Sequence, residues 1–111
     1  MGFEKVCAAD EVPVDEALAV TVGDLELAIA RDGEELFALQ NVCSHAEVAL
    51  SEGEVADGTV ECWLHGSCFD LRTGKPTHLP ATEPVATFAV EVRDGDVYVD
   101  ATEALNGVRP S

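Results

Sequence analysis

A hairpin pattern decides the fold of this chain: Leu25-Glu26-Leu27-Ala28-Ile29, then Asp32-Gly33, then Leu36-Phe37-Ala38-Leu39. The first stretch alternates apolar residues with polar or small ones, as a strand with one buried face does. Asp-Gly tolerates the positive φ angles that a tight two-residue hairpin turn requires. The segment therefore predicts two antiparallel strands joined by a tight turn.

Similar turn signals recur along the chain between short apolar stretches. We expect turns at Gly23-Asp24, Asp57-Gly58 and Asp94-Gly95, and strand residues at Ala17–Val22, Val55, Val60, Val85–Val92 and Val97–Val99. Helix signals are weak, because Pro13 and nearby valines favour extended chain where Glu11 to Ala19 allow one short turn. The sequence predicts an all-β fold, a small antiparallel sandwich or barrel built from hairpins.

Length and hydropathy bound the organisation of the chain. Its 111 residues have the usual size of one domain, and no repeat or linker divides them, so we expect a single domain over 1–111. No run approaches the roughly 18 consecutive apolar residues of a membrane span. The start, Met1-Gly2-Phe3-Glu4-Lys5, carries charge where a signal peptide has an apolar run. These features predict a cytoplasmic protein.

The charge is strongly negative, with 22 acidic residues against 6 basic ones and a formal net charge of −16. Nucleic acid is not an expected partner, because phosphate binding needs a basic surface. An anionic membrane would be repelled in the same way. Two interpretations stay open: the acidity serves solubility and adaptation to high salt, or it steers the protein toward a partner with a basic docking face.

The cysteines and histidines carry the chemical signal. Four cysteines without a signal peptide do not indicate a disulfide framework, and cysteines near histidines are more often metal ligands. Cys43-Ser44-His45 and Cys62-Trp63-Leu64-His65 each pair one thiolate with one imidazole, and sixteen residues separate His45 from Cys62. Each pair follows a predicted strand, Leu36–Gln40 or Thr59–Glu61, so both lie where side chains converge at strand ends.

These four residues allow three interpretations. Chance is the plainest, but two of only three histidines lie close to two of four cysteines. A Cys₂His₂ zinc site is the stronger alternative, because tetrahedral S₂N₂ sets suit zinc as well as iron–sulfur chemistry. Zinc fingers, however, usually group cysteine with cysteine and histidine with histidine. Mixed pairs are what a cluster with two dissimilar irons would use.

The two motifs, followed by Phe69-Asp70-Leu71-Arg72-Thr73-Gly74-Lys75-Pro76, resemble those of the Rieske [2Fe–2S] ferredoxins of bacterial aromatic-ring dioxygenase systems. The resemblance covers nearly the whole chain. It implies one [2Fe–2S] cluster held by two loops at one end of the fold. Cys43 and Cys62 would hold one iron, and His45 and His65 the other, as in Rieske centres generally.

The resemblance also implies a function. The chain would be a monomeric electron carrier and not itself an enzyme, taking single electrons from a flavin-dependent ferredoxin reductase and passing them to a terminal non-heme iron oxygenase in transient encounters. A mononuclear iron site needs two histidines and a carboxylate, and only His78 remains beyond the two predicted ligands. An apolar docking ring is expected at Val48, Ala49, Leu50 and Leu79.

Two alternative functions stay open at this point: a Rieske-like small subunit of another oxidoreductase, of the nitrite reductase type, or a zinc-binding module. Within the Rieske resemblance, the high-potential respiratory proteins carry a disulfide and a tyrosine near the cluster. Here the corresponding positions are Val48, Leu64 and Phe69, whereas a serine is retained as Ser67. Fewer hydrogen-bond donors to sulfur predict a potential at the low end of the Rieske range, about −150 to 0 mV.

Overall fold

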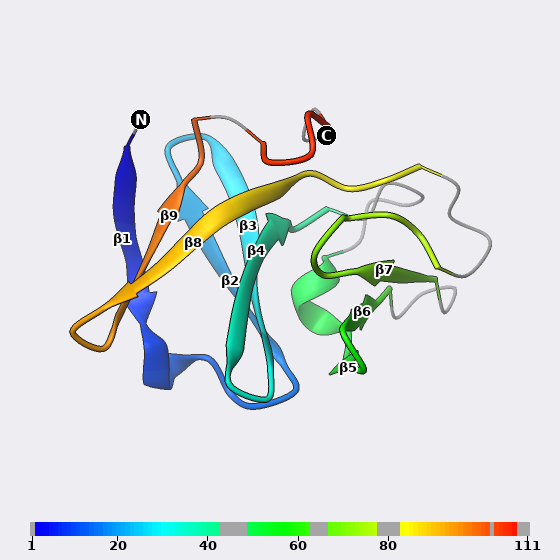
Figure 1. The fold of residues 1–111 in the computed structure, drawn as a ribbon, viewed down its shortest axis with the longest axis horizontal. Coiled ribbons are helices and arrows are strands. Elements are labelled where there is room, and N and C mark those ends of the chain that lie inside the picture. The colour runs from blue at the N-terminus through cyan, green and yellow to red at the C-terminus, as the bar shows by residue number, and fades with distance from the viewer. Residues whose placement is uncertain (1, 43–48, 63–66, 78–82, 103, 109–111) are drawn as a thin grey trace.

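A computed structural model describes residues 2–42, 49–62, 67–77, 83–102 and 104–108. These residues form nine strands and two short 3-10 helices in the order β1, η1, β2, β3, β4, η2, β5, β6, β7, β8, β9. The predicted all-β fold is therefore confirmed (Figure 1). The described part of the chain contains no helix long and apolar enough to cross a membrane.

The larger sheet has six antiparallel strands in the order β1-β9-β8-β4-β3-β2. Its two edge strands, β1 and β2, also approach each other, so the sheet curls into a near-barrel. The strands are β1 Phe3–Ala8, β2 Ala17–Val22, β3 Leu25–Asp32, β4 Glu35–Gln40, β8 Thr87–Arg93 and β9 Asp96–Asp100. The 3-10 helix η1, Ala9–Glu11, joins β1 to the chain that leads into β2.

A smaller sheet lies beside the larger one in Figure 1 and has the order β5-β6-β7. Its strands are β5 Val55–Ala56, β6 Thr59–Glu61 and β7 Cys68–Asp70, and the 3-10 helix η2, Leu50–Glu52, precedes it. Val60 pairs with Val55 on one side and Phe69 on the other. The sheet therefore places the chain around Cys62 next to the start of β7.

The predicted hairpins form, although the two-residue turn between β3 and β4 is Gly33-Glu34, because Asp32 belongs to β3. Strands β3 and β4 pair from Leu27↔Gln40 to Asp32↔Glu35. In the β5–β6 hairpin, Asp57 and Gly58 have φ values of 52° and 75°, the left-handed region that this kind of turn demands. The stretch from Glu11 to Ala19 follows the extended alternative, because helical backbone is limited to η1 and β2 begins at Ala17.

Two apolar cores hold the fold together. One fills the near-barrel, and its buried members include Leu27, Ile29, Phe88, Val97 and Val99. The other lies between the small sheet and strands β3 and β4, and consists of Ala30, Leu39, Leu50, Val55, Val60, Cys62, Phe69, Leu71 and Val85. Cys62 thus belongs to the core that joins the two sheets, which ties a predicted ligand to the rigid part of the molecule.

Candidate metal centre

Of the four predicted ligands, Cys62 lies within the described residues, and Cys43, His45 and His65 lie outside them. Cys62 follows β6 directly and is fully buried. Its backbone N–H donates to the carbonyl of Ser67 at 2.6 Å. This bond joins the two residues that flank segment 63–66, and the thiol of Cys62 beside it is held away from water.

The segment that carries Cys43 and His45 is closed in a similar way at its base. Val42 and Ala49 form an isolated antiparallel bridge on either side of residues 43–48. The carbonyl of Asn41 accepts the N–H of Leu50 at 2.6 Å. The side-chain Oδ1 of Asn41 accepts the N–H of Ser51 at 2.9 Å. These contacts hold together the two ends of the segment that carries the predicted first pair of ligands.

Gly53 lets the chain that follows the first ligand segment pack closely against the chain that leads into the second. A Cβ atom built on Gly53 would lie 1.6 Å from the carbonyl oxygen of Glu61, so only glycine permits this approach. The N–H of Glu61 donates to the carbonyl of Glu54 at 2.9 Å. Because Glu61 immediately precedes Cys62, the chain returning from the first segment packs against the strand that presents the predicted ligand of the second.

A third segment meets the same end of the small sheet. The N–H of Thr77 donates to the carbonyl of Cys68 at 2.7 Å, and the N–H of Val85 donates to the carbonyl of Gly74 at 2.8 Å. The proline-containing residues between Thr77 and Val85 therefore start beside the strand that follows the second ligand pair. Three chain segments have their bases near the buried Cys62.

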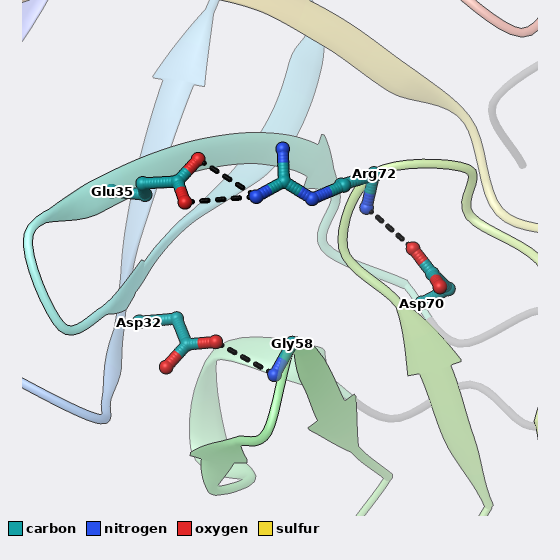
Figure 2. A network of polar contacts seen from close by, with 5 residues as sticks. All are labelled: Asp32, Glu35, Gly58, Asp70 and Arg72. Carbon is teal, nitrogen blue, oxygen red and sulfur yellow. Dashed lines mark hydrogen bonds and ion pairs between the residues drawn. The ribbon is translucent and has the colours of Figure 1, made fainter.

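The opposite end of the small sheet is tied to the β3–β4 hairpin by a polar network (Figure 2). Asp32 Oδ2 accepts the N–H of Gly58 at 2.6 Å. Both carboxylate oxygens of Glu35 accept from Arg72 Nη2, at 2.8 and 3.0 Å. Asp70 Oδ1 accepts the N–H of Arg72 at 2.8 Å. Gly58 lies four residues before Cys62, roughly 13 Å along extended chain, so this network anchors the sheet without touching the buried cysteine.

The donor set fits an iron–sulfur cluster. Cys62 is free of any disulfide, and its side chain belongs to the apolar core, which shields its sulfur from water. Within the described residues no group of three or more cysteine, histidine or acidic side chains is positioned to hold a metal ion. Cys43, His45 and His65, the other predicted ligands, lie outside that part.

Comparison with known proteins decides the family. A model of the Rieske [2Fe–2S] domain matches residues 2–89. The chain belongs to the Rieske [2Fe–2S] domain family. This Rieske chain accordingly carries one [2Fe–2S] cluster, so the cofactor prediction is confirmed and the zinc-binding alternative is wrong.

Similar proteins are ferredoxins of aromatic dioxygenases. This Rieske chain is 46% identical over 93 residues to the anthranilate 1,2-dioxygenase ferredoxin subunit of Burkholderia cepacia, covering 84% of this chain and 86% of the relative. It matches the ferredoxin of carbazole 1,9a-dioxygenase from Nocardioides aromaticivorans IC177 with a TM-score of 0.83 and 36% identity, over 89% of this chain and 97% of that one.

A third match concerns a complex of reduced oxygenase and oxidized ferredoxin in carbazole 1,9a-dioxygenase. A chain of that complex matches this one with a TM-score of 0.81 and 39% identity, over 87% of this chain and 91% of that chain. The resemblance drawn from the two Cys/His motifs is thus confirmed at the level of family and fold. The ligand roles of individual residues are a separate matter and stay a prediction.

The two cysteines of this Rieske chain that are not predicted ligands occupy ordinary positions. Cys7 is buried in β1, and burial raises the pKa of its thiol, with smaller contributions from Glu11 and Asp96. Cys68 is half-buried at the start of β7, and burial raises its pKa as well. Raised pKa values keep both thiols protonated at neutral pH, which suits small packing residues.

One sequence prediction about the surface is wrong. Leu50 was expected in an apolar docking ring, but it is fully buried in the core between the sheets. The 3-10 helix η2 turns its side chain inward, where it packs with Val60 and Cys62. Ala49 is half-buried, and Val48 and Leu79 lie outside the described residues. A ring that includes Leu50 does not exist.

Three residues near the site were missed by sequence reasoning: Gln40, Asn41 and Gly53. Gln40 and Asn41 are 2% and 5% exposed, although both are polar. The signal was present, because two adjacent amides end an apolar stretch and are separated from the Cys-x-His motif by Val42 alone. Gly53 is not part of a turn dipeptide, so nothing in its neighbouring residues singles it out. Glycine is required there because the chain passes close to Glu61, eight residues away in the sequence.

Proposed function

We propose that this chain is a soluble electron carrier that holds its [2Fe–2S] cluster through Cys43, His45, Cys62 and His65. It takes single electrons from a flavin-dependent ferredoxin reductase and delivers them to a terminal non-heme iron oxygenase. The observation that carries the proposal is the buried Cys62 at the point where the bases of three segments meet. The ferredoxin names of its relatives support a carrier over a subunit of nitrite reductase type.

The chemistry of the ligands explains the choice of residues. When bound, the cluster supplies a one-electron couple whose potential lies between about −150 and +300 mV. Neutral imidazoles in place of two thiolates lower the negative charge around the irons, so that accepting an electron costs less free energy. The protein's part is to exclude water at Cys62 and to hold the two ligand pairs in fixed positions.

The acidic surface supports transient partners. At a net charge of −16, attraction to a basic docking face raises the rate of encounter and weakens as salt screens it. The related ferredoxin of carbazole 1,9a-dioxygenase occurs in a complex with its oxygenase. We propose that this chain works as a monomer of one domain, residues 1–111, in the cytoplasm, and that it meets reductase and oxygenase in turn.

The ligand set is tested by substitution and metal analysis. Purified protein should contain two irons and two inorganic sulfides per chain and should be coloured. Cys62→Ser should abolish the cluster, and His65→Cys should retain one with a lower potential, because a thiolate adds negative charge. His78→Ala is the matched control, since it removes the histidine that is not a proposed ligand. A colour that survives Cys62→Ser, or an unchanged potential in His65→Cys, would reject the assignment.

The carrier role is tested by rapid-mixing kinetics. NADH and the flavin reductase of an aromatic dioxygenase system should reduce the protein, and a terminal oxygenase should reoxidise it. Both rates should fall severalfold between 50 and 500 mM salt, because the Debye length shrinks from about 14 to 4 Å. Reduction without transfer to any oxygenase would contradict the carrier role, and rates independent of salt would contradict the proposed role of the acidic surface.

A further inference from the structure

A buried amide side chain lies at the entrance to the segment of the predicted first ligand pair. Gln40 is the last residue of β4 and is 2% exposed. Its Nε2 donates to the carbonyl of Val42 at 2.7 Å. Its Oε1 accepts the N–H of Ala86 at 2.8 Å. One side chain thus joins the residue before Cys43 to the residue two positions after Pro84.

The position of Gln40 at the end of a strand ladder explains why an amide is needed. Strands β4 and β8 pair at Ala38↔Phe88 and Leu39↔Thr87, and the N–H of Gln40 continues the ladder by donating to the carbonyl of Ala86 at 2.9 Å. Beyond this point the chains separate. The side chain of Gln40 then supplies the acceptor for Ala86 and the donor for Val42, and both of those backbone groups would otherwise lack these partners.

The amide of Gln40 therefore links two chain segments that are far apart in the sequence and holds them in a fixed position relative to each other. One continues from Val42 into Cys43 and His45, and the other returns through Ala86 after residues 78–84. The side chain of Asn41, the next residue, closes its own segment by accepting the N–H of Ser51, and its backbone bonds Leu50 and Glu26. Gln40 differs because its two partners are 44 positions apart in the sequence.

We propose that Gln40 is a positioning residue of the cluster site, setting the first ligand pair against the segment that follows Pro84. This inference rests on the ligand set proposed above. Gln40 acts through the backbone of Val42 and Ala86 by two hydrogen bonds, of which the one to Ala86 is buried and the one to Val42 part-buried, and an unpaired group in such surroundings is costly. Its loss shifts the geometry of the ligands, beyond any loss of overall stability.

The test compares Gln40→Met with a matched control. Methionine keeps the length and burial of the side chain and removes both hydrogen bonds. Arg31→Met is the control, because Arg31 also bonds two backbone carbonyls, those of Ala9 and Val12 at 3.1 and 2.9 Å. Arg31 lies at the far end of the β3–β4 hairpin, about 13 Å along the strand from the Leu27↔Gln40 pair.

Three measurements on the holoprotein separate positioning from stability: the EPR spectrum of the reduced protein, the rate at which a ferrous chelator removes iron, and the thermal unfolding midpoint. We expect Gln40→Met to change the EPR line shape and to lose iron about tenfold faster, the lower end of the effect of removing an outer-shell partner. Arg31→Met should lower the midpoint, with the wild-type EPR spectrum and iron-loss rate. Gln40→Asn, too short to reach both partners, should behave like Gln40→Met.

The inference is overturned if Gln40→Met and Gln40→Asn both show the wild-type EPR spectrum and iron-loss rate, whatever their unfolding midpoints. Gln40 would then have only a structural role. Failure of the ligand set looks different, because it is seen without any change at Gln40. In that case the wild type would lack a Rieske-type EPR signal, or Cys62→Ser would keep it.

Discussion

Replacing Gly53 by alanine should damage both the stability of the fold and the metal centre. The backbone of Gly53 has φ near −89°, which any residue adopts, so the substitution introduces no backbone strain. Its Cβ would lie 1.6 Å from the carbonyl oxygen of Glu61 and 2.9 Å from the carbonyl carbon. Real Cβ atoms do not approach other atoms closer than 3.0 Å, so the two segments must separate by more than about 1 Å.

The magnitude follows from what this separation breaks. Overpacking of this kind costs about 1–3 kcal/mol. The hydrogen bond from Glu61 N–H to the carbonyl of Glu54 is lost or stretched, which adds about 1 kcal/mol. The free energy of unfolding should therefore fall by about 2–4 kcal/mol out of the 5–15 kcal/mol typical of a domain. The variant stays folded, and the displaced Glu61 moves Cys62 with it.

Urea denaturation of the holoprotein measures the first effect, and the ratio of visible to ultraviolet absorbance after reconstitution measures the second. Gly23→Ala is the matched control, since Gly23 has φ +60° and nothing within 4 Å of a built Cβ. It should cost only the left-handed backbone penalty of about 1–2 kcal/mol and keep full cluster content. A Gly53→Ala protein within about 0.5 kcal/mol of wild type, with full cluster content, would refute the reasoning.

Three further predictions concern stability and one the potential. Thr87→Val should raise the free energy of unfolding by about 1 kcal/mol in urea denaturation, because the buried hydroxyl of Thr87 has no hydrogen-bond partner among the described residues. A double-mutant cycle of Glu35→Gln and Arg72→Met should give a coupling of about 0.2–1 kcal/mol that shrinks in high salt, because the pair is exposed. Burial raises the pKa of Cys7, so the folded state holds the thiol proton more tightly than the unfolded chain does. The free energy of unfolding should therefore fall as pH rises above 9.0. Cys7→Ala should flatten that slope between about pH 8 and 11. Protein-film voltammetry should give about −150 to 0 mV, since Phe69 has no hydroxyl to donate to sulfur, and a value above about +200 mV would contradict the low-potential assignment.

Local signals made much of the fold predictable. The β3–β4, β5–β6 and β8–β9 hairpins each have a two-residue turn that contains a glycine in the left-handed region. Such a turn depends only on residues that are neighbours in the sequence, so it can be predicted. The division into two sheets was not predictable in the same way. It depends on pairings such as Ala38↔Phe88 and Phe3↔Asp100, whose partners lie far apart in the sequence.

In the candidate site, too, the features that depend on local sequence were predictable and those that depend on distant residues were not. Its ligand motifs were visible because thiolates and imidazoles are rare and chemically distinctive. Leu50 was misplaced because a short apolar run after a ligand motif looks like an exposed loop, while the turn of η2 that buries it has no sequence signal of its own. Gln40 and Gly53 escaped notice for a related reason. Their roles depend on Ala86 and Glu61, which only the folded chain brings to them.

The small sheet is held at its two ends by contacts of different kinds. Asp32 and Glu35 hold the end at Gly58 and Arg72 through polar contacts, part of them exposed to solvent (Figure 2). Buried contacts of Gln40, Asn41 and Gly53 hold the end at Cys62. Exposed pairs contribute little and weaken in salt, whereas buried backbone bonds do not. The contacts nearest to Cys62 are therefore the ones that salt weakens least.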